Sequence, residues 1–164
     1  MSITNCEINS ADDGICLKSY YPGYANDSIY IANCTLRTSA STIKFGSASY
    51  GGFKNVTIEN IKVYDTFRSV IAIESVDGAD IENIEVSNVV AKNTGNAIFI
   101  RLGHRGGKNP GSIKNVYIHD IKVQVAFGRH ISGKSLKRNG LRSAEPFKPG
   151  AGTNKRLPRV SHVS

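Results

Sequence analysis

Apolar and polar residues alternate along most of the first 127 positions, in short runs separated by Gly, Asn, Asp and Ser. One six-residue pattern recurs five times: an apolar residue, any residue, Asn or Asp, Ile or Cys, any residue, and an apolar residue. The copies cover residues 3–8, 31–36, 58–63, 81–86 and 118–123, and their Asn or Asp positions are 28, 27, 23 and 37 residues apart. Spacings of this size are typical of the successive coils of a solenoid.

A second alternating run follows four of the five copies, at residues 15–19, 43–47, 71–75 and 98–102. Period-two alternation of Ile, Val and Phe is typical of strands, and no segment has the 3.6-residue apolar period of a helix. One coil cannot bury its apolar side chains alone, whereas stacked coils form a continuous core. The pattern therefore predicts an all-β fold, a right-handed parallel β-helix, in which the repeated Asn stacks at a bend and bonds from coil to coil.

The distribution of charge divides the chain into two segments. Its net charge is +8. Residues 1–127 contain 12 Lys and Arg and 12 Asp and Glu, whereas residues 128–164 contain nine Lys and Arg and one acid, Glu145. The alternation stops after Phe127, and a composition rich in Gly, Pro, Ser and basic residues predicts disorder beyond it. We therefore expect an incomplete β-helix domain at 1–127 and a basic tail at 128–164.

Several other partners and locations are not indicated by the sequence. The body of the chain is neutral, so we expect no nucleic-acid partner, and no run of about 18 apolar residues predicts a membrane helix. The first ten residues lack the features of a secretory signal and already lie in a repeat, which suggests a truncated N-terminus.

Residues 128–135 fit the phosphate-binding pattern G-x4-G-K-[ST]. The helix breaker Gly140 makes the next segment a poor helix, so we interpret the match as chance.

The three cysteines, Cys6, Cys16 and Cys34, form no C-x-x-C pair and no cluster with zinc-ligand spacing. An odd number of cysteines does not build a disulfide framework. We expect three small buried side chains, no metal site and no cofactor.

Polar residues of successive coils fall in line when the coils are aligned on the second strand. They are Asp12, Asp13 and Lys18 in the first coil, Ser41 and Lys44 in the second, Arg68 and Glu74 in the third, and Asn96, Arg101, His104 and Arg105 in the fourth. A β-helix holds its substrate on such a lateral face, and a mixture of carboxylates with Lys and Arg suits an anionic polymer.

Asp12 and Asp13 are the candidate catalytic pair. Two adjacent carboxylates repel each other, so that one of them can stay protonated and act as an acid. Hydrolysis of a glycosidic bond needs one carboxylic acid at the leaving oxygen and one carboxylate that acts on water or on the sugar. A solvated turn, or a pair of calcium ligands, is the alternative for these two residues.

Arg101, His104 and Arg105 are candidates for substrate binding. Arg101 lies within an apolar strand, so its guanidinium points either into solvent or at a carboxylate or phosphate. His104 and Arg105 lie on a glycine-rich loop, where ordinary surface residues are the alternative.

Three stretches resemble glycoside hydrolase family 28, the polygalacturonase and rhamnogalacturonase-like enzymes. Residues 9–19, with Asp12-Asp13-Gly14, resemble the Asp-Asp motif of the family; residues 41–56 are similar to its next coil, and residues 97–103 to its Arg-containing coil. The resemblance covers about residues 1–127 and is greatest to bacterial exo-acting or rhamnogalacturonan-type members.

The resemblance implies a pectin lyase-like solenoid that hydrolyses pectic polysaccharide with inversion. Asp12 would then be the general acid and Asp13 one of the carboxylates that activate water. Arg101 would help to bind the substrate carboxylate, and Lys44, His104 and Arg105 would be further substrate-binding residues.

The chain also departs from the family pattern. The coil with a third family aspartate would precede Met1, the histidine of the family's Gly-His-Gly has no counterpart near residues 40–42, and Gly103 stands where the family has Lys. Lys44 is the candidate to compensate for that lysine. These differences predict a poor catalyst.

The resemblance further implies a secreted or periplasmic monomer, with a pectic polysaccharide or oligogalacturonide as partner. Two other functions stay open. A pectate lyase-like β-helix would use Ca²⁺ and an Arg base, and would need acidic ligands on neighbouring coils, which the second coil does not provide. A non-catalytic β-helix would bind polysaccharide without cleaving it.

Overall fold

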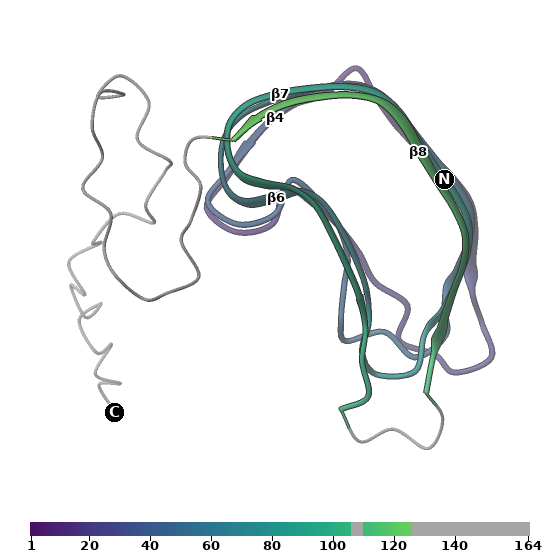
Figure 1. The fold of residues 1–164 in the computed structure, drawn as a ribbon. Coiled ribbons are helices and arrows are strands. Elements are labelled where there is room, and N and C mark those ends of the chain that lie inside the picture. The colour runs from purple at the N-terminus through teal and green to yellow at the C-terminus, as the bar shows by residue number, and fades with distance from the viewer. Residues whose placement is uncertain (106–109, 126–164) are drawn as a thin grey trace, which may run out of the picture.

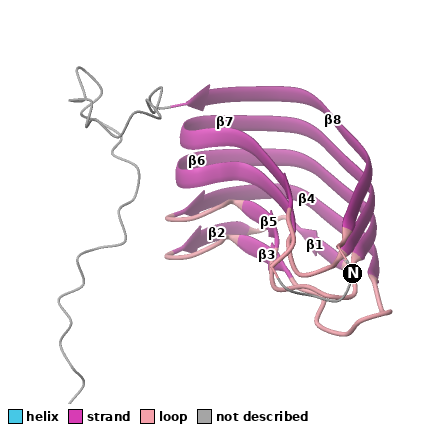
Figure 2. Cartoon of the chain, turned by 60° about the horizontal axis from the view of Figure 1, so that its bottom comes forward, coloured by secondary structure: helices cyan, strands magenta, loops and turns pink. Residues whose placement is uncertain are grey.

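The computed structural model describes residues 1–105 and 110–125, and every regular element in this part of the chain is a β-strand (Figure 2). The strands are β1 (Ser2–Thr4), β2 (Glu7–Ser10), β3 (Ile15–Leu17), β4 (Asn26–Thr38), β5 (Ile43–Phe45), β6 (Phe53–Ser75), β7 (Asp80–Leu102) and β8 (Ser112–Val125).

All strand pairs are parallel, and each coil lies on the next in the same outline (Figure 1). The first strip of the solenoid consists of β1 and β2, then β4, the first parts of β6 and β7, and β8. The second strip consists of β3, β5 and the last parts of β6 and β7. β6 and β7 run through the bend without interruption and belong to both strips. The predicted all-β parallel β-helix is confirmed.

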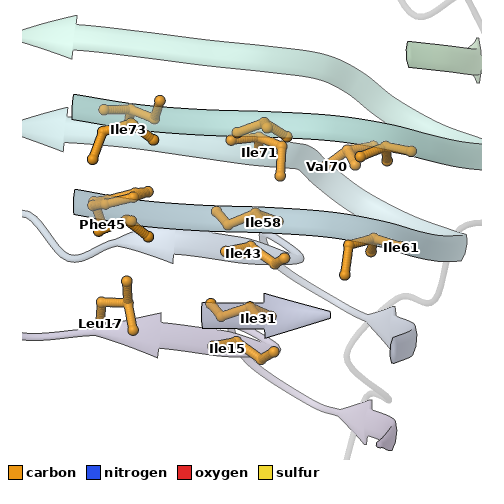
Figure 3. Packing of buried hydrophobic residues seen from close by; sticks show 14 of the residues in the cluster. Ile15, Leu17, Ile31, Ile43, Phe45, Ile58, Ile61, Val70, Ile71 and Ile73 are labelled. Carbon is orange, nitrogen blue, oxygen red and sulfur yellow. The ribbon is translucent and has the colours of Figure 1, made fainter. Parts of the chain in front are cut away.

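The core fills the space between the strips with stacked apolar side chains. Figure 3 shows Ile15, Ile43 and Ile71 one above another, as their strand register requires. Phe45 and Phe53 are fully buried and meet edge to face, with ring centroids 5.3 Å apart. Because each coil covers the apolar side chains of its neighbour, burial is nearly complete in the middle coils, and this drives the stacking.

Asparagine bends the strands. All eleven non-glycine residues with positive φ in the described ranges fall into three columns that run from coil to coil. The columns are Ser28, Asn55, Asn83 and Asn115; Asn5, Asn33, Asn60, Asn88 and Asp120; and Asp65 and Asn93. Asn and Asp tolerate the left-handed conformation better than other residues with a side chain. The predicted bonding between coils is confirmed, for example from Asn83 Nδ2 to Asn55 Oδ1 at 3.0 Å and from Asn88 Nδ2 to Asn60 Oδ1 at 2.5 Å.

The fourth copy of the repeat was aligned wrongly from the sequence. Asn83 lies opposite Asn55, not Asn60; the partner of Asn60 is Asn88. The reason is that bends recur every five residues within a coil, so residues 81–86 and 86–91 both fit the strand pattern. With Asn88 in its place, the members of the second column are 28, 27, 28 and 32 residues apart.

Two further expectations concern the cysteines and the tail. Cys34 is buried and Cys6 half-buried, but Cys16 is exposed, so the expectation of three buried thiols was wrong for Cys16, which alternates outward between buried Ile15 and Leu17. The strand pattern continues to Val125, and the predicted basic tail at 128–164 lies outside the described residues.

Candidate functional site

The outer face of the second strip carries the predicted site residues. In β3 the side chains of Ile15 and Leu17 point into the core, so that those of Cys16 and Lys18 point outward. The register places Cys16 beside Lys44, and Glu74 beside Arg101. The alignment of coils on the second strand is thus confirmed, and we call this surface the outer face.

Asp13 lies on the turn that leads into β3, and two groups of the second coil hold its carboxylate. The backbone N–H of Ser41 donates to Asp13 Oδ1 at 3.0 Å, and Lys44 Nζ lies 3.2 Å from Oδ2. The side chain is only 14% exposed. These contacts fix the direction of the carboxylate relative to the coil above it.

Asp12 has a different environment on the same turn. It is exposed, and no residue of the described part of the chain bonds to its carboxylate, although its backbone N–H donates to Ser10 Oγ at 3.2 Å. The turn itself is held to the second coil, because the hydroxyls of Thr38 and Ser39 donate to the carbonyls of Asp12 and Ala11. The two carboxylates therefore stand on a braced turn, one held by partners and one open to a ligand.

Lys44 lies between two carboxylates. Its ammonium is 3.2 Å from Asp13 and 3.6 Å from Glu74 of the third coil, and the lysine side chain is 15% exposed. Burial lowers the pKa of Lys44, but the charges of Asp13 and Glu74 and the hydrogen bond to Asp13 outweigh it, so that its pKa is raised overall. Lys44 therefore keeps its positive charge in the interior of this network.

The other predicted substrate-binding residues gather at the far end of the outer face. Arg101, His104 and Arg105 line a hollow of about 260 Å³ together with Ser47, Glu74 and Val76. Arg105 is bound bidentately by Asp77, through Nε to Oδ1 at 3.0 Å and Nη2 to Oδ2 at 2.5 Å, and this pair raises the pKa of Arg105. Arg101 is exposed and stands beside Glu74 in the strand register, so its side chain lies on the outer face.

Glu74 connects the two groups of predicted residues. It contacts Lys44 on one side and lines the hollow with Arg101 on the other. The sequence alignment put Glu74 on the outer face but gave it no role, and Asp77 was missed altogether. Glu74 precedes Arg101 by 27 residues and Asp77 precedes Arg105 by 28, so opposite charges about one coil apart were the signal that could have identified both.

Lys18 completes the outer face in the first coil. Its aliphatic chain lies over Gly46 of the second coil, where any β-carbon would collide with Lys18 Cδ, Cε and Nζ. Because Gly46 has no side chain, it leaves space for Lys18 to lie across the outer face.

Nothing in the described ranges resembles a metal cluster, since no three His, Cys, Asp or Glu residues there are grouped to hold an ion. No helix long and apolar enough to cross a membrane occurs in the same residues. Comparisons with known proteins add no relative: no family model matches the chain, and neither curated proteins nor solved structures match it.

Proposed function

We propose that this chain is a glycoside hydrolase that acts on pectic polysaccharide, polygalacturonan or rhamnogalacturonan, with Asp12 and Asp13 as the catalytic pair. The observation that carries the proposal is the contrast between the two carboxylates. Asp13 is held by the Ser41 N–H and by Lys44, whereas Asp12, on the same braced turn, is open to a ligand. The resemblance of residues 9–19 to the family Asp-Asp motif supports the same assignment.

The chemistry needs two proton transfers. Asp12 gives its proton to the glycosidic oxygen while the bond from that oxygen to the anomeric carbon breaks. Asp13 takes a proton from a water molecule whose oxygen attacks the same carbon from the opposite face. The products are two saturated sugar ends, and the new reducing end has inverted configuration. Exchange with solvent then returns Asp12 to its acid form and Asp13 to its carboxylate form.

Charge on the outer face supports an acidic sugar as the substrate. Lys18 and Lys44 place cations in the first two coils and Arg101 and Arg105 place them in the fourth, and His104 lies beside the arginines in the hollow. Guanidinium groups bind carboxylates with two parallel hydrogen bonds, which suits Arg101 to the carboxylate of a uronic acid unit. Because Asp77 accepts hydrogen bonds from Nε and Nη2 of Arg105, Arg105 can bind a substrate only through its remaining N–H groups.

The test is release of reducing ends from polygalacturonan and from rhamnogalacturonan by the full chain. We expect slow release of saturated products, and loss of at least about 100-fold in Asp12→Asn, because general acid catalysis contributes factors of about 10² to 10⁴. Glu7→Gln is the matched control, since Glu7 is an exposed carboxylate of β2 on the first strip. Full activity in Asp12→Asn would remove the acid assignment. Unsaturated products that need Ca²⁺ would instead indicate a lyase, and binding without cleavage a binding module.

A further inference from the structure

All seven tyrosines of the chain are exposed, and four of them are grouped around one end of the outer face. Tyr20, Tyr21 and Tyr24 follow β3 in the first coil and are 58%, 77% and 77% exposed; Tyr50 follows β5 in the second coil and is 44% exposed. Single exposed aromatic residues are common, but a group of this size in two neighbouring loops marks a binding surface more often than chance.

The loop that carries the first three tyrosines has a defined conformation. The backbone N–H of Tyr24 donates to the carbonyl of Tyr21 at 3.2 Å, and Ser19 Oγ donates to the carbonyl of Tyr24 at 3.0 Å. Gly23, with φ of +81°, closes this turn in a conformation that glycine adopts without strain. The phenol rings are therefore displayed from a turn whose backbone is already fixed, which lowers the entropy lost on binding.

The second loop packs directly on the first. Tyr50 N–H donates to the carbonyl of Ser19 at 2.6 Å, and Ser49 Oγ accepts from the Ser19 N–H at 3.1 Å. Gly51 lies so close to the carbonyls of Tyr21 and Tyr24 that no β-carbon would fit there. The loops after β3 and β5 appear on the same side of the stack in Figure 2. The two loops that carry the four tyrosines are thus packed together, and we call the surface that these loops present the tyrosine platform.

Positive charge borders the platform. Lys18 immediately precedes it and lies over Gly46, and the hollow of Arg101, His104 and Arg105 reaches the second coil at Ser47, three residues before Tyr50. Neighbouring coils are about 4.8 Å apart, so the platform in coils one and two is about 10 to 15 Å from the arginines of coil four. Two or three sugar rings span that distance.

We infer that the tyrosine platform is a binding subsite for an acidic oligosaccharide, whose sugar rings lie on the phenol faces while their carboxylates meet the neighbouring cations. Flat aromatic rings with a polar tip suit the apolar C–H face of a pyranose and its hydroxyl groups. The inference rests on the proposed function for the identity of the sugar. To that function the inference adds a subsite that holds the part of the polysaccharide beyond the cleaved bond.

The test is equilibrium binding of trigalacturonate to the full chain, by calorimetry and by tyrosine fluorescence, which no tryptophan obscures because the chain has none. All proteins carry Asp12→Asn, so that cleavage does not interfere. We expect the double variant Tyr21→Ala/Tyr24→Ala to bind about tenfold or more weakly, and Tyr21→Phe/Tyr24→Phe to bind within about twofold of the parent, because stacking depends on the ring. Tyr117→Ala is the control, since Tyr117 is 64% exposed on β8, away from the platform.

Far-ultraviolet circular dichroism establishes that each variant is folded, and the exposed positions make loss of the fold unexpected. Unchanged affinity in the double alanine variant overturns the inference, as does an equal loss in Tyr117→Ala. The two proposals fail separately. Cleavage of polygalacturonan by the wild-type chain, together with tyrosine-independent binding in the Asp12→Asn background, would overturn the platform alone. Tyrosine-dependent binding in a chain that never cleaves polygalacturonan would overturn the hydrolase alone.

Discussion

At the scale of single residues, Lys44 is the side chain on which the outer face depends. Its ammonium lies within 3.6 Å of carboxylates from the coil below and the coil above, and all three side chains are less than a sixth exposed. Removing one partner of such a network leaves the others buried without compensation. The geometry therefore assigns Lys44 a structural part as well as a place in the proposed site.

Replacing Lys44 by Met should lower the free energy of unfolding by about 1–3 kcal/mol, the usual cost of leaving buried polar groups unpaired. Urea denaturation followed by circular dichroism measures this. Lys62→Met is the control, because Lys62 is an exposed lysine of β6 on the first strip. Equal urea midpoints for Lys44→Met and Lys62→Met would contradict a stabilising contribution from the network of Lys44, Asp13 and Glu74.

His119 of β8 provides a pH-dependent contribution to stability. The hydrogen bond with Asp120, at 2.7 Å, is the main cause of its raised pKa, and Glu85, at 3.6 Å, adds to it against the effect of burial. A raised folded-state pKa stabilises the fold below the ordinary pKa of about 6.5, and this gain is lost as the pH rises through the raised value.

The thermal midpoint of the wild type should therefore exceed that of His119→Gln by more at pH 6 than at pH 8. Thermal unfolding of both proteins across this range, together with an NMR titration of the imidazole, checks the prediction. A difference that does not change with pH would mean that the two carboxylates do not act on His119.

Sequence predicted which residues face outward but not which of them touch. Alternation in β3 and β5 was enough to align Asp13 with the second coil, and alternation in the last parts of β6 and β7 aligned Arg101 with Glu74. Lys44 reaches Asp13 diagonally across three positions of the register and Glu74 across two. Side-chain reach of that kind depends on rotamers that a sequence pattern does not contain.

At the scale of elements, the left-handed asparagines set the path of the chain. Bends at five-residue intervals let β6 run from Phe53 to Ser75 as one curved strand, with Asn55, Asn60 and Asp65 at the bends. The sequence predicted one column of Asn and missed the other two, because each five-residue unit repeats the same apolar and polar pattern. The true register becomes visible only when neighbouring coils are paired.

At Asn60 two contributions of asparagine can be measured separately: its tolerance of the left-handed conformation and its hydrogen bond with the next coil. Asn60→Ala should cost about 2–3 kcal/mol, since it adds left-handed strain of about 1–2 kcal/mol to the loss of the bond from Asn88. Asn60→Gly should cost about 1 kcal/mol, because glycine adopts φ of +55° without strain. Urea denaturation of both variants distinguishes them. If Asn60→Ala were as stable as Asn60→Gly, the bend would not require a residue that tolerates the left-handed conformation.

At the scale of the whole molecule, stacking in register is what brings distant residues into one site. Asp13 and Arg101 are 88 positions apart in the chain and lie three coils apart on the same face. The second strand repeats predicted this arrangement because their spacing is regular. The loops between strips vary in length and carry the tyrosines, and no periodic pattern predicts how such loops pack on each other.

The most direct measurement is proton NMR of polygalacturonan during incubation with the full chain and with Asp12→Asn. We predict anomeric signals of saturated reducing ends that appear first with inverted configuration, and their absence with Asp12→Asn. Retained configuration, signals of an unsaturated product, or equal signals from the wild type and Asp12→Asn would contradict hydrolysis by Asp12 and Asp13.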